Sequence, residues 1–126
     1  MHVERYFLTL TLLQILESTV ADAMDNTSTI DLFKCKLSQL GAEYRGFAVT
    51  TVGGFRCQSW SAEQPLHKIN VDISDSDFPE KSMKLAKNYC RNPTRDPRGP
   101  WCYTLEPTVT DDECDVPLCN SGGRCH

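Results

Sequence analysis

Seven cysteines in a chain of 126 residues limit the possible folds more than any other feature of this sequence. They lie at positions 35, 57, 90, 102, 114, 119 and 125. A domain of this size obtains only a few kcal/mol from its apolar interior and normally needs covalent cross-links. In an oxidising compartment cysteines provide these cross-links as disulfides, so the sequence predicts a small disulfide-rich domain.

The N-terminus has the features of an export signal. An apolar run from Tyr6 to Leu16 follows a short polar start, and Ala21-Asp22-Ala23 provides the small-x-small pattern that signal peptidase accepts. The run is too short for a membrane span, which needs about twenty residues. We expect residues 1–23 to be a signal peptide and the mature chain to be secreted; a buried N-terminal helix is the alternative, although nothing amphipathic continues the pattern.

The net charge of the mature chain is small. Without residues 1–23 the chain keeps 12 Lys and Arg against 14 Asp and Glu, which gives a net charge of −2. Such a weak charge gives no electrostatic reason to expect nucleic acid or an acidic membrane as a partner.

Residues 24–34 are expected to be a polar leader. The sequon in this leader predicts glycosylation at Asn26 if the host is a eukaryote.

Turn-forming pairs such as Gly53-Gly54 and Asn92-Pro93 interrupt the chain between the cysteines, so we expect mostly loops. Residues 47–52 and 101–104 are candidates for short strands. Residues 79–88 begin with a proline and are candidates for a short helix.

Several motifs lie among the first six cysteines: YRG (44–46), GFRCQSW (54–60), FP (78–79), NYCRNP (88–93), GPWCYT (99–104) and DECDVPLC (112–119). With these motifs, residues 35–119 resemble a kringle domain. Six cysteines alone allow fifteen pairings. The resemblance implies three disulfides, Cys35–Cys119, Cys57–Cys102 and Cys90–Cys114, in a domain of loops and short antiparallel β-strands. It also implies that Trp60 belongs to the core.

The loop between Cys57 and Cys90 is longer than the family usually has, and its acids raise the question of calcium. Asp72, Asp75 and Asp77 lack the spacing and the glycine of an EF-hand loop, so we expect no metal and no cofactor.

Many kringles bind a lysine side chain through two carboxylates, an aromatic trough and a distant cation. Here Asp96 remains, but Thr94 stands where relatives have the first acid, and Arg95 adds a positive charge between them. Counting from the cysteines places Thr110-Asp111 where relatives have an Arg-Trp pair. We therefore expect no lysine binding. Asp96, Trp101 and Tyr103 remain a candidate surface for a protein ligand, and a structural role for the two rings is equally open.

A series of basic residues suggests a second surface, for a sulfated glycan: Lys81, Lys84, Lys87, Arg91, Arg95 and Arg98. At a spacing of three, the lysines would share one helical face. A solvated face with no ligand is the more common meaning of such a series.

Cys125 has no partner in the family pattern, so residues 120–126 are expected to form a tail with an unpaired cysteine. The segment CNSGGRC (119–125) resembles the middle of an EGF-like module, which leaves three alternatives: a piece of a longer modular protein, an intermolecular disulfide, or a free thiol. A zinc site from Cys119, Cys125 and His126 would compete with disulfide formation.

The sequence frames no histidine as a catalytic base, since His67 and His126 lack a serine or cysteine motif beside them. We expect a secreted, non-catalytic kringle that binds extracellular proteins of unknown identity. The alternatives are an accessory segment of a larger modular protease or receptor, and a disulfide-rich inhibitor or toxin.

Overall fold

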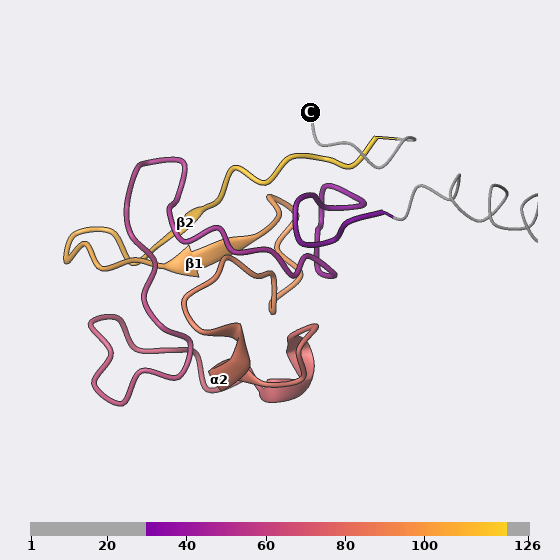
Figure 1. Cartoon of the computed structure of the whole chain (residues 1–126). Helices are drawn as coiled ribbons and strands as arrows, with labels where there is room; N and C mark the ends of the chain where they lie inside the picture. Colours follow the sequence, from indigo (N-terminus) through magenta and orange to yellow (C-terminus); the bar gives the residue numbers. More distant parts are fainter. Residues whose placement is uncertain (1–29, 121–126) are drawn as a thin grey trace, which may run out of the picture.

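The computed structural model describes residues 30–120, which form loops around two short helices and two short strands (Figure 1). In chain order these are η1 (Asp75–Asp77, a 3-10 helix), α2 (Met83–Ala86), β1 (Trp101–Tyr103) and β2 (Asp111–Glu113). No helix within this range is long and apolar enough to cross a membrane. The predicted signal peptide, the sequon at Asn26 and Cys125 lie outside the described residues.

Three disulfides connect the loops, and they are the pairs that the family resemblance implies: Cys35–Cys119, Cys57–Cys102 and Cys90–Cys114. The last two lie side by side, with the Sγ atoms of Cys57 and Cys90 3.7 Å apart. The first joins the two ends of the domain, where Lys36 and Leu118 form a parallel bridge and the indigo and yellow segments run together (Figure 1).

An aromatic cluster forms the core beside the central disulfides. The Trp60 side chain is 1% exposed, and its ring meets those of Phe78, Trp101 and Tyr103 edge-on, with centroids 5.1, 5.1 and 5.8 Å away. Its indole Nε1 donates a hydrogen bond to the Tyr89 carbonyl at 2.8 Å. Trp60 is therefore a core residue, as expected, because both its apolar surface and its polar atom are satisfied inside the domain.

The two strands pair in antiparallel register, Trp101 with Glu113 and Tyr103 with Asp111. The strand expected at 101–104 is present as β1, but the one expected at 47–52 is wrong: that segment contributes only an isolated bridge between Thr50 and Arg56. β2 was not expected, since three consecutive acids have low strand propensity. The adjoining Cys90–Cys114 bridge and the pairing with β1 hold it in place.

The one or two helical turns expected within residues 79–88 are present as a single turn, α2. Ser82 caps α2 by accepting a hydrogen bond from the Leu85 amide at 3.1 Å, and only four residues follow in helical conformation. Lys81 and Lys87, on either side, have φ angles of 56° and 51°, which no helix contains. The expectation that Lys81, Lys84 and Lys87 share one helical face is therefore wrong.

Candidate functional site

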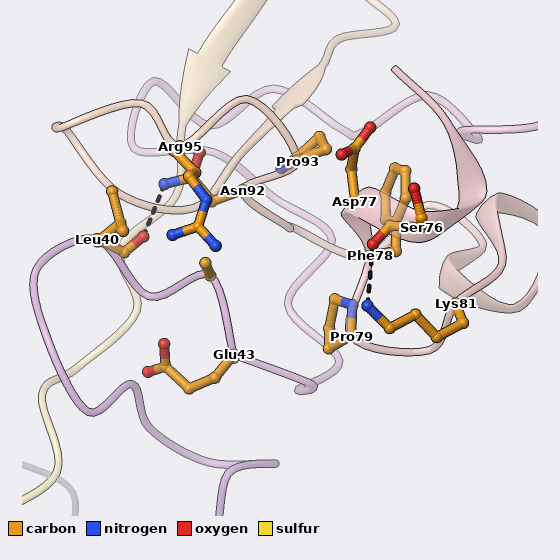
Figure 2. Close-up of a pocket in the computed structure, with 11 residues that line it drawn as sticks. Leu40, Glu43, Ser76, Asp77, Phe78, Pro79, Lys81, Asn92, Pro93 and Arg95 are labelled. Atoms are coloured by element: carbon orange, nitrogen blue, oxygen red, sulfur yellow. Dashed lines mark hydrogen bonds between the residues drawn. The ribbon is translucent and has the colours of Figure 1, made fainter. Parts of the chain in front are cut away.

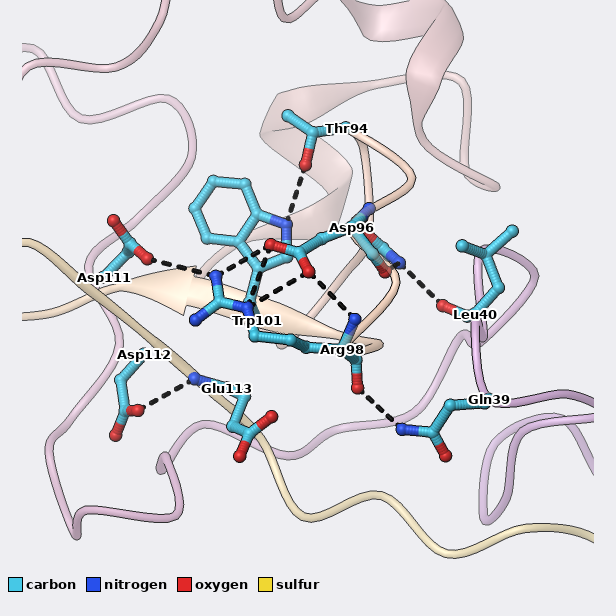
Figure 3. Close-up of polar contacts among 10 residues, drawn as sticks. Gln39, Leu40, Thr94, Asp96, Arg98, Trp101, Asp111, Asp112 and Glu113 are labelled. Atoms are coloured by element: carbon cyan, nitrogen blue, oxygen red, sulfur yellow. Dashed lines mark hydrogen bonds and ion pairs between the residues drawn. The ribbon is translucent and has the colours of Figure 1, made fainter.

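An ion pair occupies the position where lysine-binding relatives carry their anionic centre. The guanidinium of Arg98 donates to both carboxylate oxygens of Asp96, with Nη2 2.7 Å from Oδ2 and Nε 3.1 Å from Oδ1 (Figure 3). The same Nη2 lies 3.6 Å from Oδ1 of Asp111, the residue that stands where relatives have a tryptophan. The Asp96 carboxylate is thus engaged by a cation of its own chain.

Arg98 also determines the charge state of Asp96. Hydrogen bonds from the Arg98 side chain, and then from its backbone amide at 2.9 Å, hold the pKa of Asp96 below its ordinary value. The Asp96 hydrogen bond in turn raises the pKa of Arg98. Both groups therefore stay charged at neutral pH, and they neutralise one another.

A buried asparagine fixes the turn that carries Asp96. Asn92 is 2% exposed, and its Nδ2 donates to the carbonyls of Leu40 at 2.7 Å and Asp96 at 2.8 Å. Its Oδ1 accepts a hydrogen bond from the Asp96 amide at 2.8 Å. Two of these contacts close the turn between Asn92 and Asp96, and the third anchors the turn to Leu40 in a distant loop. Asn92 therefore holds Asp96 in place opposite Arg98.

The candidate surface formed by Asp96, Trp101 and Tyr103 needs correction, because the two rings belong to the core. Trp101 and Tyr103 are 6% and 8% exposed. Trp101 Nε1 donates to Thr94 Oγ1 at 3.2 Å, and Tyr103 Oη accepts a hydrogen bond from the Asn70 amide at 3.1 Å. Of the three residues only Asp96 has an accessible functional group, and Arg98 covers it.

Arg95 does not lie where the sequence suggested. Its φ is 54°, and this left-handed turn directs the side chain away from Asp96 into a surface pocket of about 450 Å³. Figure 2 shows the guanidinium reaching toward Leu40 and Glu43. Sequence reasoning assigned the neutralising cation to Arg95 and missed Arg98. The Asp96-Pro97-Arg98 spacing was the available indication, because a proline-fixed turn returns the second following side chain toward the aspartate.

The basic series does not form one surface. Arg91 is 1% exposed and pairs with Glu80 inside the domain, and Arg98 pairs with Asp96. Lys81 donates to the Ser76 carbonyl at 3.0 Å. These contacts remove the geometric basis for a continuous cationic strip along which a sulfated glycan would bind.

The acidic loop has local structural roles. Asp75 Oδ1 accepts a hydrogen bond from the Met83 amide at 2.8 Å, and Asp77 Oδ2 accepts one from the Ser74 amide at 2.8 Å. These bonds satisfy orphan amides around η1 and α2. The sulfurs of Cys57, Cys90, Cys102 and Cys114 lie within 4.8 Å of one another, but they are joined in two disulfides and are not thiolate ligands.

One comparison with known families bears on this arrangement. The family model described as Kringle domain matches residues 35–119, the segment that contains all three disulfides and the ion pair.

Proposed function

The chain belongs to the kringle family, a family of generally non-catalytic protein-binding modules, and we propose that it is an exported kringle that binds extracellular proteins without recognising lysine. The ion pair of Asp96 and Arg98 is the single observation that carries this proposal. A lysine ammonium would have to displace the Arg98 guanidinium from both oxygens of Asp96, and no second acid is present at Thr94 to compensate.

The remaining parts of a lysine site are equally unfavourable. Trp101 and Tyr103 are buried, so the methylenes of a ligand would find little exposed ring. Asp111 would repel the ligand carboxylate at the end where relatives carry a cation. Each lost charge-assisted contact costs about 1.5–3 kcal/mol, which is enough to abolish the modest affinity of so small a ligand.

Titration of the oxidised protein with 6-aminohexanoate is expected to give no saturable heat by isothermal titration calorimetry up to millimolar concentrations. Asp96→Asn is the matched control, because it removes the only carboxylate that such a ligand would use at this position. Saturable binding to the wild type that Asp96→Asn abolishes would contradict the proposal.

Export is supported by the apolar run at residues 6–16 and by the disulfides, which persist in oxidising compartments. Expression of the whole chain in secreting cells is therefore expected to yield medium protein whose N-terminal residue is Met24. N-terminal sequencing or intact mass would check this, and a product retained in the cell with residues 1–23 attached would contradict it.

A further inference from the structure

Three adjoining aromatic rings lie at the surface of the domain. The rings of Phe33 and Phe47 stack with centroids 5.6 Å apart and an interplanar angle of 15°, and Phe47 meets Tyr89 edge-on at 5.3 Å. Phe33 and Phe47 are nevertheless 50% and 61% exposed, and neither belongs to the core cluster. Single exposed apolar residues are ordinary, whereas adjoining ones mark interaction surfaces. We call Phe33, Phe47 and Tyr89 the aromatic face.

The backbone that carries the aromatic face is held in place. The Arg45 amide donates a hydrogen bond to the Leu32 carbonyl at 3.1 Å, which ties together the two segments that carry the phenylalanines. The Tyr89 carbonyl accepts a hydrogen bond from the buried indole of Trp60 at 2.8 Å. Because the rings are already positioned, a partner would order few side chains on binding, and aromatic rings provide contact area at a low cost in conformational entropy.

Cations without a counter-ion flank the aromatic face. Arg45 stands two residues before Phe47, and the Nζ atom of Lys87 lies 5.9 Å from the centroid of the Tyr89 ring. Both cationic residues are exposed, and within residues 30–120 neither takes part in an ion pair with a carboxylate. Their positive charge is therefore available to a partner that covers the rings.

We propose that the aromatic face binds an extended segment of a protein partner in which an aromatic or large aliphatic side chain adjoins Asp or Glu. The apolar side chain would cover the exposed rings of Phe33 and Phe47, and the neighbouring acid would pair with Arg45 or Lys87. The inference rests on the proposed protein-binding function, and it specifies the surface and the chemistry of the partner.

The charge of the whole chain favours a protein partner over a membrane. An anionic membrane also offers apolar contact beside negative charge, but the mature chain has a net charge of −2, which opposes its approach to such a surface. A short acidic segment meets only the aromatic face and its two flanking cations, so their local charge decides the interaction.

The test is a selection of random displayed peptides on the immobilised, oxidised protein, followed by affinity measurements on the enriched sequences. We expect enrichment of peptides in which an aromatic or large aliphatic residue adjoins Asp or Glu. Phe33→Ser/Phe47→Ser should weaken their binding by about tenfold or more, the loss typical of central interface residues. Leu66→Ser/Val71→Ser is the matched control and should leave the affinity unchanged, since these apolar residues are 51% and 83% exposed in another loop.

A second variant tests the charge while the rings stay in place. Arg45→Gln/Lys87→Gln should weaken binding of the same peptides by about threefold or more at low ionic strength, and the difference should shrink as salt is added. Lys68→Gln is its control, because it removes an exposed lysine from a different loop. This variant keeps the proposal testable if loss of both phenylalanines impairs folding.

The inference is overturned if no peptide is enriched, if the enriched peptides show no excess of acids, or if their affinity survives the loss of both phenylalanines. Sedimentation of the protein with phosphatidylcholine–phosphatidylserine vesicles, or self-association, would assign the face to a membrane or to a second copy if Phe33→Ser/Phe47→Ser abolished it, and would overturn the inference too. Peptides that bind elsewhere on the domain would leave the protein-binding function standing. The 6-aminohexanoate experiment is independent of all these results, because it reports on Asp96.

Discussion

Replacing Cys57 and Cys102 together by alanine is expected to destabilise the domain more than replacing Cys35 and Cys119, although the second pair closes the longer loop. The two bridges span 45 and 84 residues. In the chain-entropy model the stabilisation depends on the logarithm of loop length, so the longer loop gains only about 0.5 kcal/mol over the shorter one. Loop length alone therefore favours Cys35–Cys119 by a small margin.

Packing reverses this order. Cys57 and Cys102 are 1% and 0% exposed, and Cys57 Sγ lies 3.7 Å from Cys90 Sγ in the centre of the domain. Removing two sulfurs there leaves a cavity in the aromatic core cluster in addition to releasing the loop. In the other pair Cys35 is also 0% exposed, but it lies outside this cluster, and Cys119 is half-buried at the end of the domain. Loss of a native disulfide costs about 2–5 kcal/mol, and we expect the central pair at the upper end of this range.

The measurement is urea unfolding of both double variants, each with Cys125→Ala so that a free thiol does not exchange with the remaining bridges. The parent for the comparison is Cys125→Ala alone. Equal losses, or a larger loss for the Cys35–Cys119 pair, would show that chain entropy outweighs packing in this domain.

The parts of the fold that could be predicted from the sequence are those that the family resemblance implies and those that depend on large apolar side chains. The three disulfide pairs were implied by the resemblance to the kringle family, because six cysteines alone allow fifteen pairings. Trp60 has the burial expected of it because an indole ring of that size has few places other than the core in a domain this small. Such features depend little on the exact conformation of the loops.

The short elements could be predicted only in part: β1 and α2 lie where they were expected, whereas β2 was missed and the strand expected at 47–52 is wrong. Three or four residues carry too little local preference to fix a conformation. α2 ends at Ala86 because Lys87 takes a positive φ of 51°, which no propensity scale assigns to lysine. The same limit applied at the candidate site. Whether Arg95 or Arg98 faces Asp96 depends on the turn that Asn92 holds through Leu40, a residue 52 positions away in the chain.

Arg91→Met is expected to be among the most destabilising single substitutions in the domain, at about 3–5 kcal/mol. The Arg91 side chain is 2% exposed and donates to Glu80 Oε1 through Nε at 2.8 Å and through Nη2. Methionine would leave the Glu80 carboxylate, itself only 11% exposed, inside the domain without a counter-ion. Chemical unfolding of the wild type and the variant would measure the difference.

Glu80→Gln is the matched change on the other partner, and we expect it to cost less. Without the carboxylate, Arg91 Nη1 still donates to the carbonyls of Gly46 and Cys90 at 2.8 and 2.7 Å, and the guanidinium still lies 5.5 and 5.4 Å from the ring centroids of Tyr44 and Tyr89. Glu80 has no equivalent support, because its buried Oε2 lacks a hydrogen-bond partner.

The double variant Arg91→Met/Glu80→Gln separates the cost of an unpaired charge from the worth of the pair. We expect it to be more stable than Arg91→Met alone, because the neutral amide is cheaper to bury than the carboxylate. If the free-energy costs of the two substitutions instead add, the Glu80 carboxylate must already be solvated when Arg91 is absent. In that case the pair would act as a surface ion pair worth about 1 kcal/mol or less, and the large loss expected for Arg91→Met would have to come from its contacts with Gly46, Cys90 and the two tyrosines.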